Sequence, residues 1–122
     1  MRASSDNYLF AVIDKADRAH IGNIKVGPVN AMHSHADVSY FIGDRTRWNK
    51  GYATQAIRLA VAFGFETLGL HRLDAGVYES NGVSARALER AGFRLEGRFA
   101  RKLRTSRDGP WEDHLWYGLL RD

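Results

Sequence analysis

Apolar-rich segments in the first third of the chain predict three β-strands separated by polar, glycine-containing stretches. The predicted strands are residues 8–14, 20–26 and 36–42, and the predicted loops are residues 27–35 and 43–51. In the third strand Val38, Tyr40 and Ile42 share one face, whereas Ser39 and Phe41 share the other. This alternation is typical of a strand with one buried face.

The middle of the chain changes to a helical period. Small and apolar residues recur at spacings of three and four between Gly51 and Leu68, which predicts a helix with Gly69 as its C-cap. The members of this face are Ala53, Ala56, Ile57, Ala60, Val61, Gly64 and Leu68. A second helix is predicted to begin after Asn81, a good N-cap residue, and to end at Gly92.

The remaining apolar segments predict three further strands. These are residues 71–78, 93–99 and 111–119. In the second of them Phe93, Leu95, Gly97 and Phe99 alternate with charged residues, so this apolar face is predicted to be buried. Three strands, a helix, a strand, a helix and two strands in this order predict an α/β layered fold with a mixed, mostly antiparallel sheet.

Length and composition indicate one globular domain over residues 1–122. The chain is 44% hydrophobic and 26% charged, which excludes a disordered polar segment. The longest apolar run, residues 59–65, is too short to span a bilayer, and the N-terminus lacks the apolar core of a signal peptide. We expect a soluble cytoplasmic protein. Cysteine is absent, so disulfides, thiolate metal sites and a cysteine nucleophile are excluded.

The net charge of +4 is unevenly distributed. Residues 86–107 contain eight basic and two acidic residues, and the rest of the chain is slightly acidic. Two interpretations remain open at this point, a solvated arginine-rich surface and a site for a phosphate-bearing ligand. Binding to nucleic acid is disfavoured, because Phe93 and Phe99, the aromatics among these cations, belong to the face predicted to be buried.

A short segment before the first predicted helix has features of an anion site. Gly51 allows close approach of the backbone, and the amides of the following turn combine with the helix dipole. Lys50 and Thr54 could add a charge and a hydroxyl. A turn without a ligand fits the same segment, which is neither a Walker loop nor a dinucleotide-binding motif.

Four motifs follow one another within residues 36–119. They are G-Y-A-T-x-A at residues 51–56, L-H-R-L at 70–73, N-x-x-S-x-R-x-L-E-R-A-G-F at 81–93 and E-G at 96–97. Together they resemble the GCN5-related N-acetyltransferase (GNAT) superfamily, especially the branch of ribosomal-protein N-terminal, amino-sugar and diamine acetyltransferases. The resemblance implies a GNAT-type sheet flanked by helices, with acetyl-CoA as the acyl donor and no metal.

The resemblance also implies where acetyl-CoA binds. The strand at residues 36–42 would diverge from the strand at 71–78 and pair with the pantetheine, while the amides of residues 50–54 would hold the pyrophosphate. The implied cofactor-binding residues are Phe41, Ile42, Trp48, Lys50, Gly51, Tyr52, Ala53, Thr54, Asn81 and Arg86, with Arg90 as an alternative to Arg86. Trp48 stands where the family usually has arginine or glutamine.

Without a cysteine, the acceptor amine is expected to attack the thioester directly. Deprotonation at pH 7 costs about 4.6 kcal/mol for a lysine-like amine but only about 1.4 kcal/mol for an α-amino group. The candidate general base is Asp37, which some relatives replace with glutamate, and His35 is the alternative. A surface aspartate without a catalytic role is equally compatible with the sequence.

The candidate acid for the departing thiolate is Ser84, by resemblance to relatives with the N-x-x-S pattern. Many other relatives use a tyrosine one turn later, near Leu88, and that tyrosine is absent here. Ser84 could equally be an ordinary first-turn residue, and Tyr52 and Tyr78 are alternative hydroxyls.

Family domains usually begin with a further strand and one or two helices that form one wall of the acceptor pocket, so this chain is N-terminally short by comparison. Its acceptor site is therefore expected to be open, completed by a partner subunit in a homodimer, or lost. The leading hypothesis is an acetyl-CoA-dependent N-acetyltransferase. Its acceptor would be a small-molecule or peptide amine, namely a protein N-terminus, an amino sugar or a polyamine. The alternative is a non-catalytic acetyl-CoA-binding module.

Overall fold

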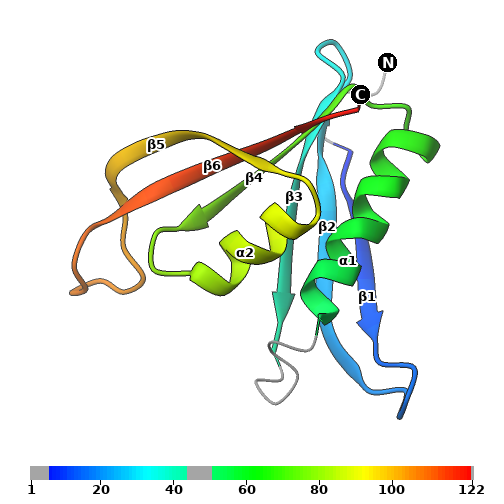
Figure 1. The fold of residues 1–122 in the computed structure, drawn as a ribbon, viewed down its shortest axis with the longest axis horizontal. Coiled ribbons are helices and arrows are strands. Elements are labelled where there is room, and N and C mark those ends of the chain that lie inside the picture. Colours follow the sequence, from blue (N-terminus) through cyan, green and yellow to red (C-terminus); the bar gives the residue numbers. More distant parts are fainter. Residues whose placement is uncertain (1–5, 44–50, 122) are drawn as a thin grey trace.

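The computed structural model describes residues 6–43 and 51–121, which fold in the predicted order of strands and helices (Figure 1). The elements are β1 (Tyr8–Ile13), β2 (His20–Asn30), β3 (His35–Ile42), α1 (Tyr52–Ala62) continued by the π-helical turn η2 (Phe63–Thr67), β4 (Arg72–Tyr78), α2 (Gly82–Arg90), β5 (Arg94–Leu103) and β6 (Glu112–Leu120). The predicted α/β class is thereby confirmed.

The strands form one mixed sheet in the order β1-β2-β3-β4-β6-β5. Only β3 and β4 pair in parallel within the described residues, and the other neighbours are antiparallel. The parallel pair is joined through α1, because parallel neighbours need a crossover connection whereas antiparallel neighbours can be joined by a turn.

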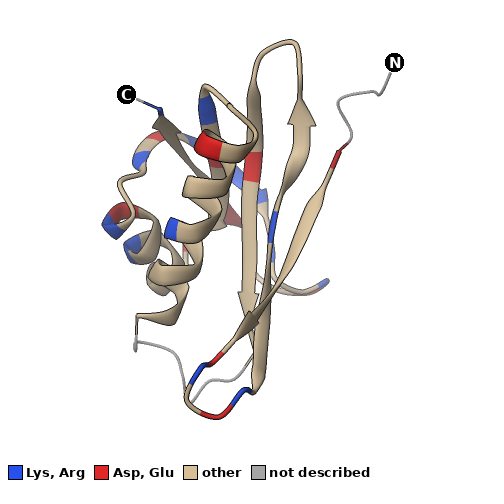
Figure 2. Ribbon diagram, turned by 90° about the vertical axis from the view of Figure 1, so that its right-hand side faces the viewer, with Lys and Arg blue, Asp and Glu red and all other residues tan. Residues whose placement is uncertain are grey.

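Both helices pack on the same face of the sheet (Figures 1 and 2). The core lies between them and the sheet, and its most completely buried large side chains are Ile57, Leu73, Leu88 and Val26. Within the described residues no helix covers the opposite face, so polar side chains on that face of β3 and β4 can form a site. None of the described helices is long and apolar enough to cross a membrane.

Strand β2 is longer than the sequence predicts, since it continues through the stretch that was expected to start a loop at Gly27. Its pairing with β3 shifts register between Val26 and Val29, which leaves Gly27 and Pro28 outside the ladder. Such a bulge accommodates a proline, which has no N–H to donate. The strand therefore resumes and ends only at Asn30.

The prediction that one face of the 93–99 strand is buried is correct for Phe93 but wrong for Leu95 and Phe99. Phe93 is 2% exposed, whereas Leu95 and Phe99 are 49% and 45% exposed. The reasons are tertiary. Leu95 shares the helix-covered face with Tyr117 but lies on β5, the last strand of the sheet, whereas the bulge after Leu95 turns Phe99 to the opposite face, beside His114. Because Phe99 is exposed, its predicted burial is not an argument against nucleic-acid binding.

Candidate active site

Strands β3 and β4 pair over a short distance and then diverge. Their three register pairs are His35 with Arg72, Ala36 with Leu73, and Asp37 with Asp74. Beyond Asp37 the two strands separate (Figure 1), and β3 continues to Ile42 paired with β2 alone. The predicted divergence is confirmed, and it leaves one edge of β3 open to an extended ligand.

A cavity of about 240 Å³ lies at this divergence. It is formed by the end of β3, the start of α1 and the first turns of α2. Its lining residues are Tyr40, Phe41, Ile42, Gly51, Ala53, Thr54, Asn81, Val83, Ser84, Arg86, Ala87 and Arg90. Most of the residues implied by the sequence motifs are therefore brought to one place from three separate segments.

Two of the predicted residues that the structure describes, Tyr52 and Asp37, do not line this cavity. The side chain of Tyr52 lines a larger, apolar cavity of about 700 Å³ between α1 and the β1–β2 hairpin. Asp37 lies on the opposite face of the sheet, since it alternates with the buried residues Ala36 and Val38. Trp48 and Lys50 lie outside the described residues.

The start of α1 has the geometry expected of an anion site. Gly51 is its N-cap residue, with φ 82° and ψ 0°, a left-handed conformation that favours glycine. No side chain caps the first turn, so the amides of Ala53 and Thr54 are not taken by a capping residue. Arg86 and Arg90 of α2 line the same cavity and add positive charge to the helix dipole.

A pair of hydroxyls lies at the inner part of the cavity. Tyr40 of β3 donates a hydrogen bond of 2.7 Å from its hydroxyl to Oγ of Ser84. Ser84 belongs to the first turn of α2, where its amide donates to Oδ1 of the N-cap residue Asn81 at 3.1 Å. Burial raises the pKa of Tyr40, and the hydrogen bond to Ser84 opposes this only in part, so Tyr40 keeps its proton at neutral pH.

Tyr40 is the functional candidate that sequence reasoning missed. The signal available in the sequence is the alternation of Tyr40 with Val38 and Ile42. It places all three side chains on the face of β3 that carries the helices. Leu88, near which many relatives have a tyrosine, is 1% exposed and belongs to the core rather than to the cavity lining. The hydroxyl beside Ser84 in this chain therefore comes from β3 instead of α2.

Asp37 has the properties of a general base. Its carboxyl is half-buried and makes no hydrogen bond with the described part of the chain. Burial raises the pKa of Asp37 above its usual value, and the neighbouring charge of Asp74 raises it further, while His35 and Lys25 act in the opposite direction. A carboxyl with a raised pKa and no fixed partner can take up a proton more readily than an ordinary surface aspartate.

Comparisons with known proteins identify the family of the chain. A sequence profile of the family described as "Acetyltransferase (GNAT) domain" matches residues 1–94. The chain therefore belongs to the GNAT acetyltransferase family.

Three relatives illustrate the similarity. A probable N-acetyltransferase of Bacillus subtilis is 39% identical over 117 residues, which are 94% of this chain and 62% of the relative. The spermidine N(1)-acetyltransferase of Escherichia coli is 28% identical over 101 residues, covering 76% of this chain and 54% of that protein. The crystal structure of spermidine N-acetyltransferase from Vibrio cholerae in complex with CoA and spermine superposes with a TM-score of 0.83 at 25% identity, covering 93% of this chain and 65% of that one. This chain thus spans less than two thirds of the length of each.

Proposed function

We propose that this chain transfers the acetyl group of acetyl-CoA directly to a primary amine. The observation that supports this most strongly is the cavity at the β3–β4 divergence, where a helix-start anion site, two arginines and a hydroxyl pair meet an open strand edge. The family assignment and the relatives named for N-acetylation support the same activity.

In this proposal the phosphates bind at the start of α1, close to Arg86 and Arg90, and the pantetheine lies along the open edge of β3. The thioester then lies in the gap between β3 and β4. The acceptor approaches from the face that carries Asp37, at the last register pair before the gap. Donor and acceptor thus meet from the two faces of the sheet.

The chemical step needs a neutral amine. Asp37 accepts a proton from the acceptor's ammonium group, and the freed lone pair attacks the thioester carbonyl carbon. The tetrahedral oxyanion is stabilised by a backbone amide near residues 41–43, as expected from the sequence. Its collapse breaks the C–S bond, and the amide nitrogen loses its second proton to water. The CoA thiolate takes a proton from the Ser84 hydroxyl, which the Tyr40 hydroxyl replenishes along their hydrogen bond before water returns a proton to Tyr40.

The proposal is tested by calorimetry with acetyl-CoA, followed by a thiol-release assay against peptide N-termini, amino sugars and polyamines. We expect saturable binding, and release of CoA with at least one class of amine. Absence of acetyl-CoA binding would contradict the proposal at its first step. Binding without release of CoA to any amine would instead identify the non-catalytic acetyl-CoA-binding module.

The one-domain organisation over residues 1–122, the homodimer and the cytoplasmic location stay predictions. The homodimer is supported by the sheet edge at β1, where Leu9 and Ile13 are largely exposed. Size-exclusion chromatography with light scattering distinguishes a dimer from a monomer.

Removal of either hydroxyl of the Tyr40–Ser84 pair is expected to slow thiolate departure. We expect Ser84→Ala and Tyr40→Phe each to lower kcat about tenfold or more, with little effect on the affinity for acetyl-CoA. Because the two hydroxyls form one hydrogen-bonded unit, the double variant should be no slower than the slower single variant. Steady-state kinetics at saturating acetyl-CoA measure all three.

Ser106→Ala is the control, since Ser106 is an exposed hydroxyl between β5 and β6, away from β3 and from the cavity lining. It is expected to retain the wild-type kcat. If the fold reductions in kcat of the two single variants multiply in the double variant, Tyr40 and Ser84 act independently.

A further inference from the structure

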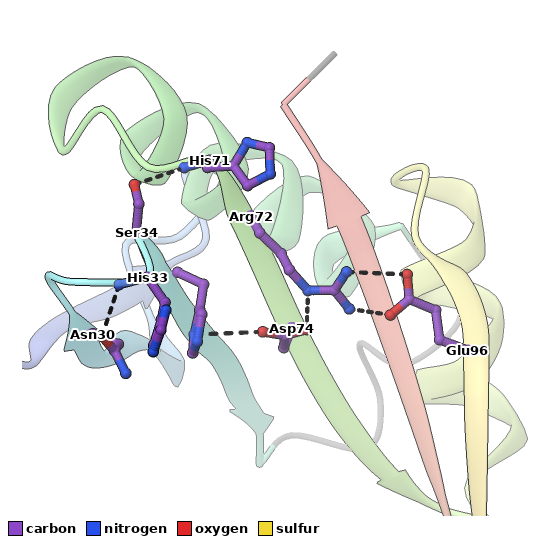
Figure 3. Close-up of polar contacts among 8 residues, drawn as sticks. Asn30, His33, Ser34, His71, Arg72, Asp74 and Glu96 are labelled. Carbon is purple, nitrogen blue, oxygen red and sulfur yellow. Dashed lines mark hydrogen bonds and ion pairs between the residues drawn. The ribbon is translucent and has the colours of Figure 1, made fainter.

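A chain of charged side chains crosses the uncovered face of the sheet (Figure 3). Arg72 of β4 donates from Nε to Oδ1 of Asp74 at 2.7 Å, and its two terminal nitrogens donate to the two carboxylate oxygens of Glu96 on β5. Each of the three guanidinium nitrogens therefore donates to one of two carboxylates. We refer to Asp74, Arg72 and Glu96 as the Arg72 network.

The fold provides a path for this network across an intervening strand. β6 lies between β4 and β5, and its Gly118 is the register partner of Asp74. A Cβ at position 118 would clash with the Arg72 guanidinium and the Glu96 carboxylate. Glu96 is the extra residue of a β-bulge, since Leu95 pairs with Tyr117 and Gly97 with Trp116. A bulge changes the direction in which side chains point, which is consistent with the Glu96 carboxylate facing Arg72.

The network fixes Asp74 beside Asp37. The two aspartates are register partners on neighbouring parallel strands, so their side chains emerge on the same face. The side chain of Asp74 is 8% exposed, and its orientation is held by the Arg72 hydrogen bond. Its second oxygen, Oδ2, lies 3.8 Å from Nδ1 of His35.

The other charged groups around Asp37 are few. Lys25 from β2 and His35 from β3 itself act to favour its ionised form, whereas Asp74 from β4 disfavours it. Arg72 is shared between Asp74 and Glu96, so the network carries one negative charge in excess. This excess negative charge lies next to Asp37, whose carboxylate makes no hydrogen bond with the described part of the chain.

We propose that Asp74 is a positioning residue for acetyl transfer: held by Arg72 and Glu96, its charge adds to the strength with which Asp37 draws the proton from the acceptor amine. The inference rests on the proposed function and assigns a role to the L-H-R-L and E-G motifs, which contribute Arg72 and Glu96. Asp74 itself does not touch the reacting atoms. Its effect is transmitted through the field that it exerts on Asp37.

The test is the Asp74→Asn variant, which keeps an oxygen that can accept from Arg72 but removes the charge. A weaker repulsion makes Asp37 a weaker base, so the plateau of kcat/KM is expected to fall while its acid limb moves to lower pH. At a pH on that limb, the ratio of kcat/KM to its plateau value is expected to be several-fold higher in the variant than in the wild type. Asp74→Glu keeps the charge and is expected to restore the position of the limb.

Direct titration separates this inference from the proposed function. The side-chain carboxyl carbon of Asp37, followed by NMR in the 122-residue chain, is expected to titrate at lower pH in Asp74→Asn than in the wild type. Asp113→Asn is the matched control, because Asp113 also accepts from an arginine, Arg98, at 2.7 Å but is not among the groups that act on Asp37.

The outcomes are distinct. An Asp37 titration that Asp74→Asn leaves unchanged, or that Asp113→Asn moves equally, would overturn the positioning role even in an active enzyme. Failure of the wild type to acetylate any amine would overturn the proposed function, and the NMR comparison would still decide whether Asp74 sets the protonation of Asp37.

Discussion

Replacement of Asp37 by asparagine is expected to lower kcat/KM for acetyl transfer by about 10²- to 10³-fold, because it removes the proposed general base. The affinity for acetyl-CoA should change little, since Asp37 does not line the cavity at the β3–β4 divergence. In the wild type, kcat/KM is expected to fall as the pH decreases through the raised pKa of Asp37, because only the ionised carboxylate can accept a proton. Calorimetry and pH-dependent kinetics of the same preparations measure both quantities.

Stability provides the control for this variant. The folded chain raises the pKa of Asp37 mainly by burial, so the wild type gains stability as the pH falls towards the unfolded-state pKa and carries a penalty at neutral pH. Asp37→Asn removes that penalty, and its thermal midpoint at pH 7 should equal or exceed that of the wild type. Loss of activity with loss of folding would point to a structural role instead.

His35 is the competing base, and His35→Gln distinguishes the two. His35 lies two residues before Asp37 in β3, and its Nδ1 faces Asp74 rather than the gap between the strands. A modest effect is therefore expected. A larger loss in His35→Gln than in Asp37→Asn would reassign the base.

The second large effect is expected on stability. Leu88→Ala should reduce the free energy of unfolding by about 3 kcal/mol, because Leu88 is 1% exposed in the core between α2 and the sheet and its truncation leaves a cavity. Urea denaturation measures this change as a lower transition midpoint with an unchanged slope.

Leu59→Ala is the matched control for Leu88→Ala. It makes the same substitution in a helix, but Leu59 is 73% exposed on α1. Its effect is expected to stay within about 0.5 kcal/mol. Equal losses at the two positions would mean that α2 is not packed on the sheet as described.

The order of strands and helices can be predicted from the sequence, because the spacing and cap residues that indicate each element lie within a short stretch of chain. The spacing from Ala53 to Gly64 predicts the first helix, and Asn81 and Gly92 bracket the second, since both depend on residues within one or two turns. The exposure of Leu95 and Phe99 could not be predicted in the same way. Leu95 is exposed because β5 is the edge strand of the sheet, and Phe99 is exposed because the bulge between Leu95 and Gly97 turns it to the face without helices; neither feature follows from the alternation.

The residues of the candidate site differ in the same way, since some depend on local sequence and others on contacts between distant segments. Gly51, Asn81 and Ser84 are predicted from short motifs and the family resemblance that these motifs carry, because each lies at a helix start where its neighbours in sequence are also its neighbours in space. Tyr40 was missed, since its partner Ser84 is 44 residues away in the chain.

The sequence by itself determined the order of strands and helices, the glycine at the start of the first helix and the absence of a cysteine nucleophile, all of which depend on residue type and short-range spacing. The separation of β3 and β4 was already implied by the family resemblance. Only the tertiary structure decided that it begins after Asp37, that Tyr40 meets Ser84, and that Arg72 reaches Glu96 across Gly118. These features arise where strands distant in sequence become neighbours, and no local period encodes which strands those are. The chemistry proposed for this chain depends on that arrangement, because it places a base on one face of the sheet and an acid on the other.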